Sequence, residues 1–97
     1  MTANGHIDLV SRDLIEGWLH LGLPGPTPTL EIHHGEDLIG TCQPDQPRPD
    51  LAAAGLGDCA FSFLVPLHRI VKNPDKIRLR LAGTPLHLLP DAETRVG

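Results

Sequence analysis

Aromatic residues are scarce in this chain: its 97 residues include one tryptophan, two phenylalanines and no tyrosine. This composition argues against a ligand platform built from stacked aromatic rings. A small core needs bulky side chains, and all three aromatic residues lie in segments that read as strands. We therefore predict that Trp18, Phe61 and Phe63 belong to the core.

Positive charge is also limited. Eight Lys and Arg residues stand against twelve Asp and Glu residues, which gives a formal net charge of -4 and no dense basic stripe. Nucleic acid is therefore not an expected partner. No apolar run approaches the roughly 20 residues of a membrane-spanning helix, and the chain does not start with a basic segment followed by an apolar one. We expect a cytoplasmic protein without membrane insertion.

Cysteine is rare as well, with Cys42 and Cys59 as the two examples. They could form one disulfide, but two reduced thiols fit better with a chain that shows no secretory sequence. Their spacing matches no redox motif.

Apolar and polar residues alternate along most of the chain. In KIRLRLA, Lys76, Arg78 and Arg80 alternate with apolar residues, which predicts a half-buried strand with a basic outer face that is solvated or docks a partner. Similar patterns predict further strands within residues 6–10, 13–21, 30–34, 38–42, 59–66 and 86–89.

Segments rich in proline and glycine separate these strands. Residues 22–29 and 43–49 can be neither helices nor interior strands, so we expect loops there. A turn at His34-Gly35 joins two strands into a hairpin, and the length of that turn decides whether Leu38 or Ile39 faces the core.

The stretch RPDLAAAGLGDCAFSF, residues 48–63, is the most organised part of the sequence. Pro49 fixes the backbone direction in which the chain enters the turn, and Asp50 is expected to cap one helical turn. Gly55 and Gly57 permit the positive φ angles with which the chain leaves that turn toward a central strand. The stretch is therefore predicted to form a structural corner.

Short strands punctuated by turns are typical of two-sheet proteins. We predict one all-β domain over residues 1–97, an immunoglobulin-like β-sandwich of about seven short antiparallel strands. It has one short helical turn near residues 50–54 and a loose C-terminal tail from about residue 91.

Several short motifs follow one another in a specific order. They are GHID at 5–8, IEGW at 15–18, LEI at 30–32, LIGT at 38–41, RPDLAAAGLGD at 48–58 and FSF at 61–63. Together they resemble a bacterial accessory module found beside glycosyltransferase and surface-polysaccharide proteins, and RPDLAAAGLGD carries most of the likeness. The resemblance implies an immunoglobulin-like β-sandwich without catalysis, associated with bacterial glycoconjugate or cell-surface systems.

Residue types that carry chemistry do not fall into catalytic or metal-binding patterns. His33 and His34 are neighbours, but neighbours on a strand face opposite sides, and no further ligand stands at metal spacing. Ser62 lies mid-strand rather than in a nucleophile elbow. We therefore predict no metal, no cofactor and no enzymatic activity, with a small hydrolase or a metal-binding protein as a minority alternative.

Polar residues near the corner form the candidate ligand site. Arg48, Asp50 and Asp58 lie in the corner itself, and Asp45 precedes it. Two roles compete for Arg48: a brace to Asp50 or Asp58, and a guanidinium that binds a ligand.

The main prediction is a non-catalytic binding or scaffolding module with a protein partner or a fused neighbouring domain. The alternative is a carbohydrate-binding domain with a polar site near Arg48–Asp58. Exposed sheet edges can also pair with a second copy of the chain, so a homo-oligomer is a further alternative.

Overall fold

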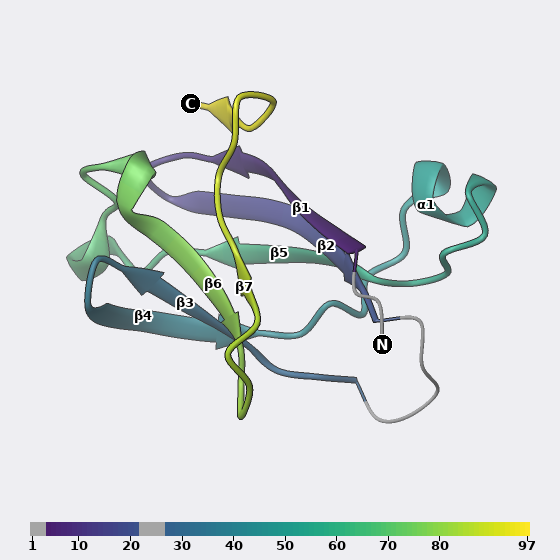
Figure 1. Ribbon diagram of the computed structural model, residues 1–97. Coiled ribbons are helices and arrows are strands. Elements are labelled where there is room, and N and C mark those ends of the chain that lie inside the picture. The colour runs from purple at the N-terminus through teal and green to yellow at the C-terminus, as the bar shows by residue number, and fades with distance from the viewer. Residues whose placement is uncertain (1–3, 22–26) are drawn as a thin grey trace.

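The computed structural model describes residues 4–21 and 27–97, and it consists of two four-stranded sheets (Figure 1). One sheet has the order β5-β2-β1-β8 and contains β1 (Asn4–Val10), β2 (Leu14–His20), β5 (Ala60–Leu64) and β8 (Arg95–Val96). The other has the order β4-β3-β6-β7 and contains β3 (Leu30–His34), β4 (Asp37–Cys42), β6 (Ile77–Leu81) and β7 (His87–Leu88). The predicted all-β sandwich is confirmed.

In the described residues, helical structure is confined to single turns. They are α1 (Pro49–Ala53), which projects at one end of the sandwich, and the 3-10 turns η1 (Leu67–Arg69) and η2 (Pro74–Lys76) (Figure 1). Within the described ranges, no helix has the length and apolar character needed to cross a membrane. Most of the loop predicted at 22–29 lies outside the described residues.

The distribution of strands follows the immunoglobulin-like plan. β1, β2 and β5 share one sheet while β3, β4, β6 and β7 share the other, which corresponds to strands A, B and E against C, C′, F and G. The last strand, β8, lies beside β1 and runs parallel to it, whereas the other strand pairs are antiparallel.

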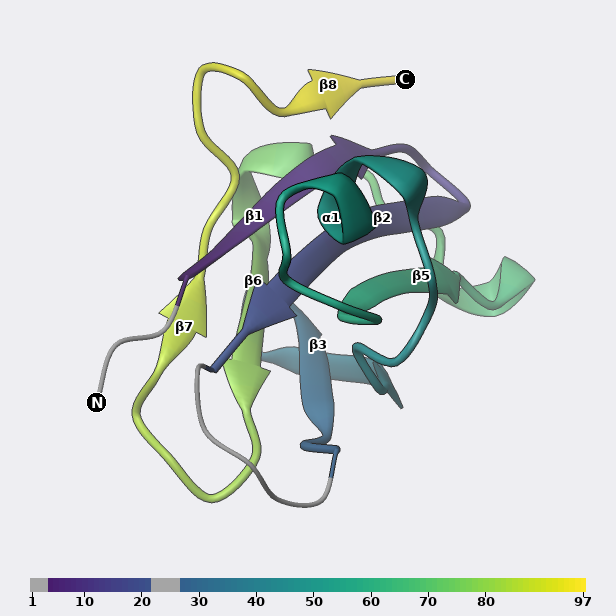
Figure 2. The ribbon, with the colours of Figure 1, turned by 90° about the vertical axis from the view of Figure 1, so that its right-hand side faces the viewer.

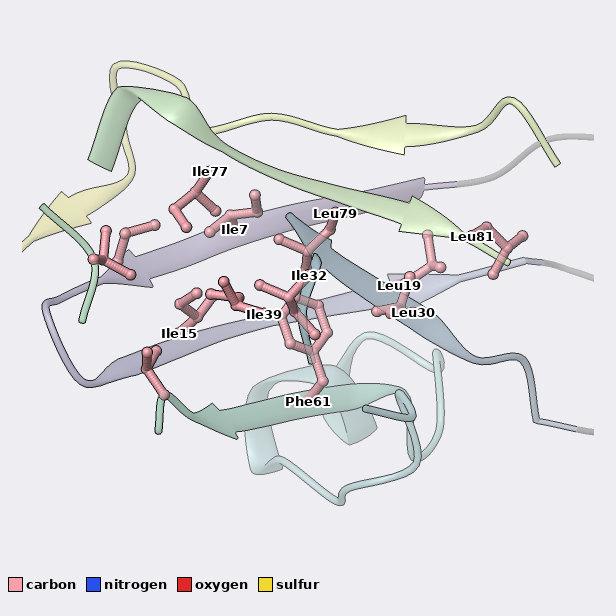
Figure 3. Close-up of a cluster of buried hydrophobic side chains, with 13 residues drawn as sticks. Ile7, Ile15, Leu19, Leu30, Ile32, Ile39, Phe61, Ile77, Leu79 and Leu81 are labelled. Atoms are coloured by element: carbon pink, nitrogen blue, oxygen red, sulfur yellow. The ribbon is translucent and has the colours of Figure 1, made fainter. Parts of the chain in front are cut away.

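Alternation along each strand separates inner from outer side chains. The inner ones meet between the sheets, where Ile7, Ile15, Ile32 and Leu79 are fully buried (Figure 3). Phe61 lies among them and is only 2% exposed. The apolar periodicity of the sequence therefore translates directly into the core.

The three aromatic residues occupy different places. Phe61 lies in the main core, and Phe63 is half-buried at its margin, where its ring lies over Gly40 of β4. Trp18 lies outside this core, because the even-numbered residues of β2 face away from the opposite sheet. It packs instead against a second, smaller hydrophobic cluster that includes Leu51 of α1, so the main core contains Phe61 but not Trp18.

The β3–β4 hairpin settles an alternative that the sequence leaves open. The turn contains Gly35 at a φ of 64°, and the strand register shifts after Ile32. Because of this irregularity, Ile39 points into the core and Leu38 is exposed.

The loose tail predicted from about residue 91 is not observed. β8 pairs with Leu9 and Val10 of β1, and Thr94 is buried. The Thr94 hydroxyl donates a hydrogen bond to the carbonyl oxygen of Ile7 at 2.6 Å. These contacts join residues at opposite ends of the sequence, so local composition does not reveal them.

Candidate functional site

Asp8 stands at an irregularity in β1. Ile7 and the residue two positions after it pair with consecutive residues of β2, so Asp8 is the extra residue of a β-bulge. The bulge lets Ile7 and Val10, three positions apart, both face the core. It also leaves the Asp8 carboxylate on the outer side of the sheet.

Arg48 connects this bulge to the corner around α1. Its Nη1 donates to Oδ2 of Asp8 at 2.6 Å, and its Nε and Nη2 donate to the two carboxylate oxygens of Asp50 at 3.0 and 2.6 Å. Hydrogen bonds to Asp50 first, and to Asp8 next, raise the pKa of Arg48, while Arg48 lowers the pKa of Asp50. The guanidinium is therefore charged and fixed in orientation.

The corner itself follows from its local sequence. Arg48 has extended backbone angles, as expected for a residue before proline, and Pro49 occupies the first turn of α1. Gly55 and Gly57 both have a φ of 77°, as predicted. The predicted cap is wrong: α1 begins at Pro49 with Arg48 at the N-cap position, so Asp50 lies inside the helix, and its carboxylate binds Arg48.

His6 ties the other side of the bulge to the C-terminal segment. Its Nδ1 lies 2.8 Å from Oδ1 of Asp8, and its Nε2 lies 3.0 Å from Oδ1 of Asp91. These hydrogen bonds, that with Asp8 first, raise the pKa of His6, and His6 in turn lowers the pKa of Asp91. The contact between His6 and Asp91, together with the buried Thr94, holds Glu93 and Arg95 near β1.

A groove of about 410 Å³ lies between these two anchored segments. We call it the charged groove, and besides Phe61 it is lined by Asp8, Glu16, Arg48, Glu93 and Arg95. Figure 2 shows α1, which directly follows one groove arginine in the chain, and β8, which contains the other. Three carboxylates and two guanidiniums give the groove many hydrogen-bond acceptors and donors on one surface.

The structure divides the site residues predicted from the sequence. Arg48 lines the charged groove and Asp50 supports it from α1. Asp45 and Asp58 are exposed and not among the residues that line the groove. Asp45 contacts only its neighbour Gln46 among the side-chain hydrogen bonds of the described residues, at 3.4 Å.

Four groove residues were not predicted: Asp8, Glu16, Glu93 and Arg95. The three-residue spacing of Ile7 and Val10 is a sign of a bulge, and a bulge marks Asp8 as a residue with an unusual direction. Nothing in the local sequence indicates that residues 93–95 lie beside β1.

The basic outer face predicted on β6 is partly neutralised. Arg80 lies opposite Glu31 of β3, with Nε and Oε1 3.4 Å apart, and Arg78 lies opposite His33. Both arginines are half-buried by their neighbours. The face carries fewer free charges than the sequence suggests.

Histidine and cysteine side chains are dispersed. Nε2 of His33 lies 3.2 Å from Oε1 of Glu31, whereas the His34 ring accepts a hydrogen bond from the backbone amide of Asn73. Cys42 and Cys59 are free thiols. In residues 4–21 and 27–97, no three His, Cys, Asp or Glu side chains gather in the way a metal ion requires.

Comparison with known proteins adds no relative: no protein-family model, curated protein or solved structure matches this chain.

Proposed function

We propose that the protein is a non-catalytic binding module and that the charged groove is its ligand site. The observation that carries the proposal is the convergence on one hollow surface of five charged side chains from the N-terminal, middle and C-terminal parts of the chain. They are held there by a β-bulge, a braced arginine and an anchored C-terminal segment.

A saccharide is the ligand class that suits this groove best. Carboxylates and guanidiniums bind neighbouring hydroxyl groups through paired hydrogen bonds, and the mixture of both charges favours a neutral, hydroxyl-rich molecule over a strongly charged one. Arg48 is already oriented by Asp8 and Asp50, which lowers the entropic cost of binding. Trp18 packs against the cluster around Leu51 and is not among the residues that line the groove, so the proposed site has no tryptophan stacking surface.

The absence of catalysis in this proposal rests on how Asp8 is used. Oδ2 of Asp8 accepts from Arg48, and Oδ1 lies against His6. A carboxylate engaged on both oxygens is a poor general base or nucleophile. The role of the groove is then recognition.

The biological setting is proposed from the resemblance of the sequence to the bacterial accessory module. A binding domain of this kind serves glycoconjugate or cell-surface assembly by holding a polysaccharide near a fused or partner enzyme. The scaffolding partner remains a prediction from the same resemblance.

Titration with a panel of bacterial polysaccharides tests the proposal, with binding followed by calorimetry or by NMR shifts. We expect Arg95→Ala and Glu16→Gln each to weaken binding at least about tenfold, since each removes charge-assisted hydrogen bonds to the ligand. Lys76→Ala and Glu36→Gln are matched controls, because both residues are exposed and outside the groove, and they should leave binding unchanged.

Arg48→Ala should abolish binding as well, but it also removes the brace, so its stability must be measured in parallel. If no saccharide binds, the carbohydrate ligand is wrong. If saccharides bind equally well to the groove variants and to the controls, the location is wrong.

A further inference from the structure

A second pocket lies at the end of the sandwich opposite α1, between the β3–β4 turn and the segment that contains η1 (Figure 1). Its volume is about 390 Å³, and it shares no lining residue with the charged groove. Four of its lining side chains end in nitrogen groups that can be positively charged, so we call it the basic pocket. They are His34, His68, Arg69 and Lys72.

The basic pocket is a positive site on an acidic protein. Arg69 and Lys72 carry two permanent positive charges and Asp37 adds one negative charge, whereas the whole chain has a formal net charge of -4. Among the residues that the structure describes, none of these three forms an ion pair. By contrast, Arg48 and Arg80 are paired with carboxylates. The positive charges of the basic pocket are therefore available to an anion from solution.

The segment that carries Arg69 and Lys72 is held in place by its backbone. Val71 lies between the two and is only 5% exposed, and its amide donates to the Arg12 carbonyl at 3.1 Å. The Arg69 amide donates to the Pro66 carbonyl at 2.8 Å and closes η1. Because the backbone is already ordered, an incoming ligand has only side chains to immobilise, which lowers the entropic cost of binding.

His34 offers a hydrogen-bond donor that the fold selects. Its Nε2 accepts from the Asn73 amide at 3.3 Å, so the proton of the neutral ring is on Nδ1. Two isoleucines, Ile39 and Ile70, form the apolar part of the wall. Apolar surroundings reduce screening by water, which strengthens the attraction between an anion and the nearby positive charges.

These groups suit a phosphate better than a carboxylate. A carboxylate offers two oxygens, whereas a phosphate monoester has three terminal oxygens and a charge of about -1.5 to -2 at pH 7. Arginine binds phosphate through its planar fork, and lysine binds it as a point charge. The Asp37 carboxylate repels the phosphate itself but can accept a hydrogen bond from a hydroxyl group beside it. The pocket therefore fits a phosphate attached to a hydroxyl-bearing molecule.

We propose that the basic pocket binds a small, hydroxyl-bearing phosphate monoester, with its phosphate at Arg69 and Lys72 and a hydroxyl group at Asp37. The volume lies within the range of small-molecule sites. This site is separate from the charged groove, so either proposal can fail without the other.

Calorimetric titration and NMR shifts in low-salt buffer test the inference with inorganic phosphate, glucose 6-phosphate and glucose. Glucose, which has no phosphate, reports any saccharide binding in the charged groove. We expect glucose 6-phosphate to bind more tightly than inorganic phosphate, with NMR shifts at residues 34–39 and 68–72.

Arg69→Gln and Lys72→Gln should each weaken the binding of glucose 6-phosphate at least about fivefold, because each removes a charge-assisted hydrogen bond. Lys76→Gln is the matched control. Lys76 is exposed and close to Lys72 in the chain but does not line the pocket, so its replacement should change the affinity less than about twofold.

Asp37→Ala tests the hydroxyl contact through two opposite effects. It removes a negative charge, so inorganic phosphate should bind about twofold more tightly. It also removes the acceptor, so the preference for glucose 6-phosphate over inorganic phosphate should fall. Glu36→Gln, which removes the same charge from an exposed neighbour outside the pocket, should leave that preference unchanged.

Circular dichroism and thermal unfolding establish that each variant folds, and Lys72→Gln decides the outcome if Arg69→Gln does not fold. The inference is overturned if neither phosphate compound binds at millimolar concentration, or if both variants bind as tightly as the unmodified chain. NMR shifts confined to the charged groove would overturn the location. Equal affinity of the unmodified chain for inorganic phosphate and glucose 6-phosphate would overturn the hydroxyl contact.

Discussion

Replacement of Thr94 by valine measures how firmly the C-terminal segment is held. The hydroxyl donates to the Ile7 carbonyl at 2.6 Å and accepts from the Asp91 amide at 3.0 Å, in a side chain that is 8% exposed. Valine keeps the shape of threonine but makes neither bond. A buried polar group left without its partner costs about 1–3 kcal/mol.

We therefore expect Thr94→Val to lower the free energy of unfolding by about 2 kcal/mol. For a domain of this size, each kcal/mol shifts the melting temperature by roughly 4–8 °C, so Tm should fall by about 8–16 °C. Urea titration gives the free energy, and a thermal scan gives Tm. Thr41→Val is the control, because Thr41 lies exposed on β4 and its replacement should change stability by less than about 0.5 kcal/mol.

The same variant has a second consequence. Glu93 and Arg95 flank Thr94 in the chain and line the charged groove, so a loosened anchor should also weaken ligand binding. Equal stability of Thr94→Val and Thr41→Val would refute the reasoning. It would mean that the two hydrogen bonds of the Thr94 hydroxyl contribute nothing measurable to the stability of the fold.

Three further predictions follow from single side chains. Gly17→Ala should cost about 1–3 kcal/mol in a urea titration, because the new methyl group would collide with the backbone oxygen of His6 and lie 2.7 Å from the Phe61 ring; a cost near zero would contradict this. The hydrogen bond to Asp8 is the largest cause of the raised pKa of His6. Protonated His6 therefore stabilises the folded protein fully below about pH 6.5, and this contribution is lost as the pH rises through the raised pKa. His6→Asn should therefore flatten the stability profile above pH 6.5, and an unchanged profile would refute this assignment. Burial raises the pKa of Cys42 to about 11, so native protein at pH 8 should react with a thiol reagent much more slowly at this residue than urea-unfolded protein, and equal rates would contradict the burial.

Features that depend on local periodicity could be predicted from the sequence. The alternation in β6 and the paired turn glycines after α1 are properties of neighbouring residues, and both appear as expected. The sandwich follows because several such strands, each with one apolar face, must cover one another.

Features that depend on distant contacts could not be predicted in the same way. The second carboxylate on Arg48 comes from Asp8, 40 residues earlier, and the partner of Thr94 is 87 residues away. Asp50 illustrates the competition between near and far contacts. The sequence predicts that it caps a helical turn, but α1 begins one residue earlier, at Pro49, and the carboxylate of Asp50 binds the Arg48 guanidinium instead.

The parallel pairing of β8 with β1 has a mechanical consequence. The two strands run in the same direction, and β8 pairs with the last residues of β1, so the start of β1 and the end of β8 lie at opposite poles of this strand pair (Figure 2). Tension applied between these poles pulls β1 and β8 past each other along their length. The hydrogen bonds between them include the one from the Gly97 amide to the Val10 carbonyl. Under this tension all of these bonds would be loaded in shear at the same time, instead of opening one after another. A module fixed between two neighbours would resist stretching through this short pair first.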